Sequence, residues 1–344
     1  MSIWSDLTAR SLAELRSAPE TYRPTNFWGP GLDQLLGDMS GSGLENFKKW
    51  PTSRVWFYPV YGNGYSNATI ADVFDAARRV NTHATQPFLA GGLNGSLDAR
   101  RDHDVASAAW DQARWPFDLG NHGESKVGKP PQAYRLNPVN QDVAFGRAYL
   151  NYLLCLSALS RHVDAPPRSF LEIGGGFGVL GEILLSRDPA TRYVDIDIPP
   201  LLTVASYYLT ELFGADRIAT YDESIPTQGP ITSTGSAVLP NYRLGDLQDT
   251  FEVFVNSYSF QEMEPDVVDS YIGQVCDRGI TWAVSLNSRD GKPRATQSGE
   301  WGALEPVRSA DIAEMFGRRG LRVVGTYDAP LVRSAGQLLI MRRD

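Results

Sequence analysis

Hydrophobic and polar residues follow two different periodicities in the second half of the chain. Residues 170–173 form an apolar run with one acid, Glu172, which is typical of a buried parallel strand. After several glycines, apolar residues recur at helical spacing from Val179 to Leu184, and a second apolar strand at 192–196 ends among acids. The pattern therefore predicts a strand, a glycine-rich turn, a helix and a second parallel strand.

The same alternation continues to the C-terminus. Further strands are predicted at 237–239, 251–256 and 280–286, and helices at 265–276 and 309–319. Such alternation predicts an α/β fold with an open, mostly parallel sheet and helices on both faces. The last two strands, 321–327 and 337–341, are joined by a turn too short for a parallel crossover. We therefore expect them to form an antiparallel hairpin.

Residues 1–140 show a different pattern, in which short helical segments alternate with turns. Helical periodicity in this part occurs only at 5–15, 70–80 and 105–114, which are predicted to be helices. Six of the eight tryptophans also lie within residues 1–140. A long apolar helix is predicted at 141–162. We therefore divide the chain into an N-terminal helical and loop module, 1–140, and an α/β domain, 141–344. The module is expected to cover an acceptor site or to form a dimer, although its aromatic residues can equally form its own core.

Composition and charge narrow the class of protein. The 344 residues are 42% hydrophobic and 21% charged, as in an ordinary globular protein. A net charge of -8 disfavours nucleic acid and anionic membranes as partners. Cys155 and Cys276 lie in apolar helical contexts and predict buried thiols. The N-terminus lacks the pattern of a signal peptide and the chain lacks a long apolar run, so a cytoplasmic protein is expected.

The glycine turn and the acids after it predict a site for a nucleoside-containing cofactor. Its glycines are Gly174, Gly175, Gly176 and Gly178. Glycine lets the backbone approach a ligand, and the N-terminus of the following helix presents free N–H groups. Asp195 and Asp197 follow about 20 residues later, where an acid can bind ribose hydroxyls. The turn also fits the fingerprint of NAD(P)-dependent oxidoreductases, and such glycines can simply allow tight packing.

The acid before the turn distinguishes these alternatives. Glu172 is the first residue of the sequence Glu-x-Gly-x-Gly-x-Gly, which resembles motif I of class I S-adenosylmethionine (SAM)-dependent methyltransferases. The segments 171–185, 193–209 and 254–272 together resemble a family of sugar O-methyltransferases of polyketide glycoside biosynthesis, and the likeness runs from about residue 124 to the C-terminus. The resemblance implies a Rossmann-like, seven-stranded sheet whose reversed last strand lies beside the fifth. It also implies SAM as cofactor and S-adenosylhomocysteine as product.

The same resemblance assigns cofactor contacts. Glu172 and the four glycines would hold the methionine part, and Asp195 or Asp197 the ribose. Asp246, after the third strand, would approach the adenine. Asn256 and Ser257, at the end of the fourth strand, complete this group of candidates.

Methyl transfer to a hydroxyl requires a base in a site closed to water. Reaction centres of open α/β sheets lie beyond the carboxyl ends of the strands, which favours residues 257–264. Glu262 is the first candidate for the base, with Gln261 as a hydrogen-bonding partner, although acids near Pro265 can merely complement a helix dipole. His122 is an alternative base, because histidine titrates nearest neutral pH. Carboxylates could bind a divalent cation, but no spaced motif predicts a metal site.

Aromatic and cationic residues are candidates for contact with the acceptor: Trp56, Tyr61, Tyr258, Arg289 and Trp301. Aromatic faces pack on the C–H face of a sugar. We therefore expect O-methylation of a deoxysugar, either in a nucleotide sugar or in a natural-product glycoside. A nitrogen, carboxylate or phenol acceptor, an NAD(P)-dependent oxidoreductase and a SAM-binding protein without activity remain as alternatives.

Overall fold

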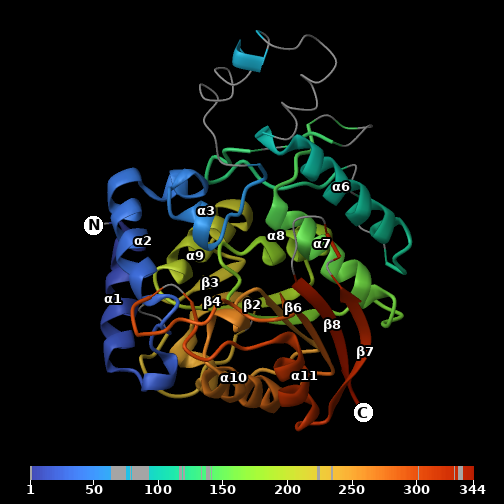
Figure 1. The fold of residues 1–344 in the computed structure, drawn as a ribbon. Coiled ribbons are helices and arrows are strands. Elements are labelled where there is room, and N and C mark those ends of the chain that lie inside the picture. The colour runs from blue at the N-terminus through green and yellow to red at the C-terminus, as the bar shows by residue number, and fades with distance from the viewer. Residues whose placement is uncertain are drawn as a thin grey trace.

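The computed structural model is built around one eight-stranded sheet in the order β3-β4-β2-β1-β5-β6-β8-β7 (Figure 1). The strands are β1 (Ser169–Ile173), β2 (Arg192–Asp197), β3 (Ile218–Thr220), β4 (Ser236–Pro240), β5 (Val253–Ser257), β6 (Trp282–Ser288), β7 (Leu321–Asp328) and β8 (Gly336–Arg343). The structure describes residues 2–62, 75–77, 79, 93–115, 118, 121–132, 134–136, 140, 142–222, 225–233, 235–300, 302–328, 330–331 and 336–344. The helix predicted at 70–80 lies largely outside these residues.

The pairing of the strands confirms the predicted α/β, Rossmann-like fold. Strands β1 to β6 pair in parallel, whereas β8 is antiparallel to both β6 and β7, with Val284 opposite Ile340. The reversed strand therefore lies beside β6, as expected for the terminal hairpin. The sheet has eight strands instead of seven because β3 adds a short edge strand. Three residues are too few to produce a recognisable pattern, so the sequence did not reveal it.

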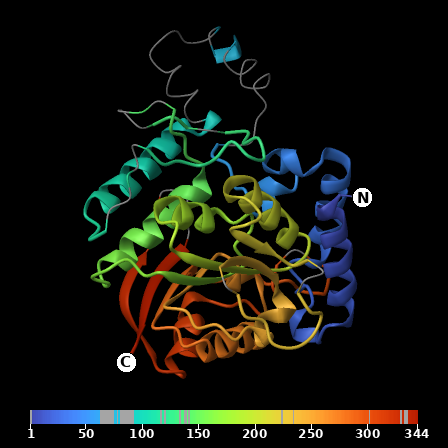
Figure 2. The ribbon, with the colours of Figure 1, turned by 180° about the vertical axis from the view of Figure 1, so that it is seen from behind.

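Helices cover both faces of the sheet, which explains why its central strands are buried (Figures 1 and 2). On one face lie α7 (Arg147–Ser160), α8 (Val179–Arg187) and α9 (Leu201–Phe213), and on the other lie α10 (Pro265–Asp277) and α11 (Ser309–Gly317). Helix α7 is shorter than the predicted helix at 141–162. Phe145 pairs with Tyr134 in an isolated β-bridge, and Gly146 is the N-cap of the helix.

The N-terminal part packs around α9 and α7. It contains α1 (Ile3–Ser17), η1 (Glu20–Tyr22), α2 (Gly29–Ser42), η2 (Leu44–Lys49), α3 (Ser53–Trp56) and α6 (Ser96–Asp111). The hydroxyl groups of Thr8 in α1 and Thr203 in α9 lie 2.8 Å apart. The predicted helix at 5–15 is confirmed, and the one predicted at 105–114 begins earlier, at Ser96.

One hydrophobic core joins the two predicted parts, because it extends from Leu7 and Phe47 through α7 to the sheet. The division at residue 140 therefore stays a prediction. Cys155 is buried and Cys276 is half-buried, and both are free thiols. Within the described ranges, no helix has the length and apolar character needed to cross a bilayer.

Candidate functional site

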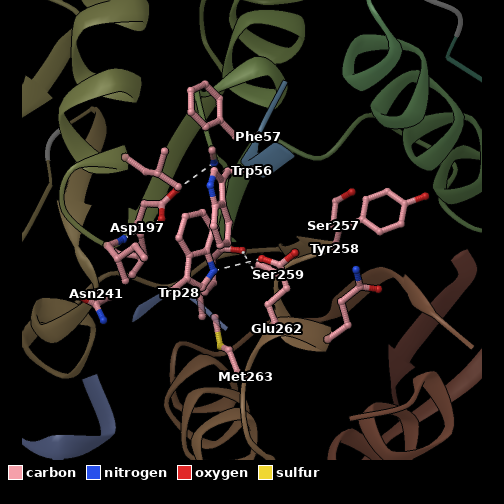
Figure 3. Close-up of a pocket in the computed structure, with 18 of the residues that line it drawn as sticks. Trp28, Trp56, Phe57, Asp197, Asn241, Ser257, Tyr258, Ser259, Glu262 and Met263 are labelled. Atoms are coloured by element: carbon pink, nitrogen blue, oxygen red, sulfur yellow. Dashed lines mark hydrogen bonds between the residues drawn. The ribbon is translucent and has the colours of Figure 1, made fainter. Parts of the chain in front are cut away.

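A cavity of about 250 Å³ lies at the carboxyl ends of β1, β2 and β5. The strand ends contribute Ile173, Ile196 and Ser257 to its wall. Residues 21–28 and 55–59 of the N-terminal part form another wall (Figure 3). In the sheet, β2 lies on one side of β1 and β5 lies on the other, so the strand order reverses at β1. Ligands of open α/β sheets bind at the carboxyl ends of the strands at such a point.

The glycine turn after β1 forms the floor of the cavity through Gly174, Gly175 and Gly176. Gly174 and Gly176 have φ values of 74° and 67°, in the left-handed region that favours glycine. A Cβ on Gly174 would lie 2.4 Å from the side chain of Ser259. Gly178, also left-handed, packs against Leu209 and is the N-cap of α8. It does not line the cavity, so its place in the turn is structural.

The two acids of β2 differ in where they lie. Asp197 lines the cavity, and its carboxylate accepts hydrogen bonds from the N–H groups of Gly176 at 2.9 Å and Ile198 at 2.7 Å. Asp195 lies beneath the turn, where Oδ1 accepts a bond from Gly175 N at 3.2 Å and Oδ2 is buried with no partner in the part of the chain that the structure describes. Burial raises the pKa of both carboxyl groups. Only Asp197 is therefore placed to contact a ligand directly.

Glu172 is fully buried and does not reach the cavity wall. Its carboxylate accepts hydrogen bonds from the hydroxyls of Tyr152 and Tyr193, each at 2.5 Å. Burial raises the pKa of Glu172 to about 7, although both hydroxyls oppose the shift. Tyr152 does line the cavity, so Glu172 is connected to the cavity wall through the hydroxyl of this tyrosine.

An asparagine that the sequence analysis did not single out follows β4. Asn241 begins η3 (Asn241–Asp246) and lines the cavity. Its Nδ2 donates to Tyr22 O at 2.7 Å and to Tyr271 Oη at 2.9 Å, while Oδ1 is buried without a partner among the described residues. Asp246, the residue predicted for this region, pairs with Arg243 at the other end of η3 and does not line the cavity.

Glu262 is the most chemically distinctive residue of the opposite wall. It ends η4 (Phe260–Glu262) and is only 8% exposed. Trp28 Nε1 donates a hydrogen bond to Oε2 at 3.1 Å, and Lys292 Nζ lies 3.0 Å from Oε1. Burial raises the pKa of Glu262 to about 7, against the opposing effects of Lys292 and Trp28. A carboxyl group with this pKa can accept and release a proton near neutral pH.

Two further predicted residues, Asn256 near the end of β5 and Gln261 after it, have structural partners. Gln261 lines the cavity, but its Oε1 accepts a bond from Ser288 N at 2.6 Å. Asn256 donates to Ile173 O at 3.0 Å and to Ser259 Oγ at 2.6 Å, which ties the ends of β1 and β5 together. Tyr258 lines the cavity with a positive φ of 64°, which is unusual for a residue with a side chain.

Aromatic residues of the N-terminal part enclose the cavity. Trp28 and Trp56 have ring centroids 4.5 Å apart with an angle of 31° between their planes (Figure 3). Phe57 lines the same wall. Trp56 was predicted to contact the acceptor. Trp28 and Lys292 were not, because neither belongs to a motif and only the folded chain brings them to Glu262.

Several predicted residues do not line this cavity. The Tyr61 hydroxyl donates to buried Asp102 at 2.6 Å, and Arg289 pairs with Asp328 at the surface at 2.5 Å. His122 directly follows the turn at Asn121, with Nδ1 3.2 Å from Asp118 O. Trp301 lies outside the described residues. Among the residues that the structure describes, no group of three or more His, Cys, Asp or Glu side chains could hold a metal ion.

Comparison with known proteins gives distant relatives. No family model matches the chain. The phenazine-1-carboxylate N-methyltransferase of Pseudomonas aeruginosa is 23% identical over 215 residues, which cover 55% of this chain and 60% of that protein. The chain thus spans less than two thirds of the length of this relative.

Two solved structures are similar at a low level. The pyocyanin biosynthetic protein PhzM is 16% identical over 57% of this chain and 58% of its own, with a TM-score of 0.38. The mitomycin 7-O-methyltransferase MmcR is 15% identical over 100% of this chain and 76% of its own, with a TM-score of 0.37. At these TM-scores, neither structure indicates the activity of this chain.

Proposed function

We propose that this chain is a SAM-dependent methyltransferase. The observation that carries the proposal is that the glycine turn, Asp197 and Glu262 line one cavity at the carboxyl ends of the strands. The relative of 23% identity, which is named as a methyltransferase, supports the same reaction class. When bound, SAM supplies an activated methyl group on a positively charged sulfur.

The residues of the cavity suit the parts of this cofactor. The Asp197 carboxylate would accept hydrogen bonds from the ribose hydroxyls. Asn241 Oδ1, which is buried and has no partner among the described residues, would accept one from the adenine amino group. Arg147 in the first turn of α7 and Asn151 one turn later line the cavity and would bind the methionine carboxylate. The first turn of α7 contains no acid, so the positive end of the helix dipole favours an anion there.

We propose that Glu262 is the general base and that residues 21–28 act as a lid. Thr25 Oγ1 donates to Glu262 O at 2.7 Å, and Asn26 Nδ2 donates to Gly302 O at 2.9 Å. These bonds fasten the segment across the cavity and keep water away from the reacting groups. Glu262, with a pKa of about 7, would take the proton of the acceptor.

As acceptor we propose a hydroxyl of a deoxysugar, either in a nucleotide sugar or in a natural-product glycoside. The aromatic wall of Trp28 and Trp56 can pack on the apolar face of a sugar ring, and Glu262 can receive its hydroxyl proton. A planar aromatic acceptor is the second candidate. It fits the same wall, and the relative is named for an aromatic carboxylate.

Calorimetry on the purified chain tests the cofactor directly. We expect S-adenosylhomocysteine to bind with micromolar affinity and NAD not to bind. Binding of NAD in place of S-adenosylhomocysteine would identify an oxidoreductase and contradict the proposal. Incubation with SAM and candidate glycosides, followed by mass spectrometry, should show the gain of one methyl group. A protein that binds the cofactor but has no activity would give binding without any methylated product.

A further inference from the structure

We propose that Glu262 and Lys292 act together on a single acceptor hydroxyl, and that the acceptor is therefore an alcohol or a phenol and not a nitrogen. This inference rests on the proposed methyl transfer and names the chemical class of its substrate. It assigns Lys292 a role in binding the acceptor oxygen.

The geometry places both charged groups at the same point of the cavity. Lys292 Nζ and Glu262 Oε1 lie 3.0 Å apart, and both side chains line the wall. The second carboxylate oxygen is already bonded to Trp28 Nε1. A hydroxyl that donates to Oε1 would therefore come within reach of Nζ as well. Lys292 Nζ also lies 4.5 Å from the ring centroid of Phe27, and this ring shields one side of the ammonium group from water.

Three separate segments are needed to build this arrangement. Glu262 comes from η4 after β5, Lys292 from the loop after β6, and Trp28 from the segment before α2. Hydrogen bonds from backbone to side chain fix η4 against the end of β6, because Gln261 N donates to Asn287 Oδ1 at 3.2 Å and Ser288 N donates to Gln261 Oε1. The ion pair is thus held by the fold. Glu262 is buried and Lys292 is half-buried, and an ion pair of this kind contributes little to stability by itself, which favours a functional reason for it.

The other charged and titratable groups of the cavity lie on several elements. Asp197 of β2 acts on Glu262 as a like charge, while the remaining groups on the wall are Arg23, Arg147, Tyr152, Tyr258 and Tyr271. Lys292 is the cation that bonds directly to Glu262 among the described residues. Its positive charge opposes the effect of burial and keeps the Glu262 carboxylate available as a base near neutral pH.

The reaction balances with these groups alone and the proposed cofactor. The O–H bond of the acceptor breaks and its proton passes to Glu262 Oε1. The electron pair of the oxygen forms the new bond to the methyl carbon, while the pair of the C–S bond returns to sulfur. The products are the methyl ether, S-adenosylhomocysteine and protonated Glu262, which then releases its proton to solvent.

The charge of Lys292 favours oxygen over nitrogen. The acceptor oxygen becomes negative as its proton leaves, and an ammonium in contact with it stabilises that charge. A neutral amine or ring nitrogen becomes positive as it is methylated, so the same ammonium would repel it. The structure therefore predicts a different acceptor atom from that of the relative, which is named as an N-methyltransferase.

The Trp28 indole provides a test that needs no knowledge of the acceptor. In the complex with S-adenosylhomocysteine, the ¹H and ¹⁵N shifts of the indole N–H should follow the ionisation of Glu262, with a midpoint near pH 7. Lys292→Met should raise this midpoint by roughly one to three pH units, whereas Lys292→Arg should keep it near that of the wild type. The proposal that Lys292 and Glu262 act together would be contradicted if the midpoint of the indole titration were unchanged in Lys292→Met. It would also be contradicted if the indole shifts still titrated in Glu262→Gln.

A second measurement tests the choice of acceptor atom. Matched phenols and anilines, and matched sugars and aminosugars, are incubated with SAM that carries an isotopically labelled methyl group. We expect the label on oxygen only, and a loss of rate on the order of a hundredfold in Lys292→Met with partial rescue by Lys292→Arg. Labelled N-methyl product would overturn the inference. Failure of the wild type to bind S-adenosylhomocysteine would instead contradict the proposed function itself.

Discussion

Trp28 and Glu262 are separated by 234 positions in the chain, yet the indole N–H of Trp28 donates to Glu262 Oε2 at 3.1 Å. The hydrogen bond joins the segment that covers the cavity to the carboxylate with a raised pKa (Figure 3). Burial of this carboxylate therefore depends on the position of the N-terminal segment. If that segment moves away, Glu262 gains water and its pKa falls toward the ordinary value.

Replacing Glu262 by Gln should abolish most of the methyl transfer. The amide keeps the shape of the side chain but cannot accept a proton, and loss of a general base typically lowers the rate by about 10²–10⁴-fold. Steady-state turnover measures this effect, and calorimetry should show an unchanged affinity for S-adenosylhomocysteine. Asp266→Asn is the matched control, because Asp266 is an exposed acid at the start of α10. Equal turnover in both variants would remove Glu262 from the mechanism.

Replacing Trp28 by Phe should change the pH dependence more than the affinity for the cofactor. Phenylalanine keeps an aromatic ring beside Trp56 but loses the hydrogen bond that lowers the pKa of Glu262. The base must be ionised to act, so the acidic limb of the pH–rate profile should move to higher pH. A profile of kcat against pH checks this prediction. Trp56→Phe retains the bond between Trp28 and Glu262 and should leave the limb in place, and an equal movement in both variants would contradict the argument.

The two acids of β2 predict different outcomes when each is changed to Asn. Asp197 lines the cavity, so Asp197→Asn should weaken binding of S-adenosylhomocysteine by roughly tenfold or more, as expected for a lost charged hydrogen bond. Asp195 lies beneath the turn and bonds only to the backbone there, so Asp195→Asn should change stability more than affinity. Calorimetry and thermal unfolding of both variants separate these effects. If Asp195→Asn weakened binding of S-adenosylhomocysteine more than Asp197→Asn did, Asp195 and not Asp197 would be the residue that binds the ribose.

The sequence predicted the turn and the pair of acids Asp195 and Asp197 because local pattern determines them, but it did not distinguish between the two acids. Glycines after a buried strand and an acid at the end of the next strand meet wherever parallel strands share an edge. The position of Glu262 followed from the same rule. Lys292 and Trp28 could not be predicted, because each lies in an irregular segment whose path depends on tertiary packing. Asp246 was proposed for the region that Asn241 occupies, since the sequence alone did not show that η3 turns its first residue toward the cavity.

Stability should depend on pH through Glu182, which lies away from the cavity wall. Burial raises its pKa to about 7, and Glu124 acts in the same direction, while Lys48 and Tyr208 oppose the shift. A group whose pKa is higher in the folded state stabilises the protein below its unfolded pKa and loses that contribution as pH rises through the folded pKa. The contribution of Glu182 to the free energy of unfolding should therefore fall, by roughly 3 kcal/mol, as pH rises through the window from 4.5 to about 7.

Glu182→Gln should remove the part of the pH dependence that Glu182 contributes, while the raised pKa values of Glu172 and Glu262 maintain the rest. The amide can still accept the bond from Ser125 N, and the pair between Lys48 Nζ and Glu124 Oε1, 2.7 Å apart, remains. In this variant the Lys48 ammonium faces the Glu124 carboxylate alone, so no excess negative charge is buried at this place. Denaturant unfolding at the two ends of the pH window measures the difference for both proteins. The same slope in wild type and variant would assign the dependence to another buried carboxyl group, of which Glu172 is the first to test.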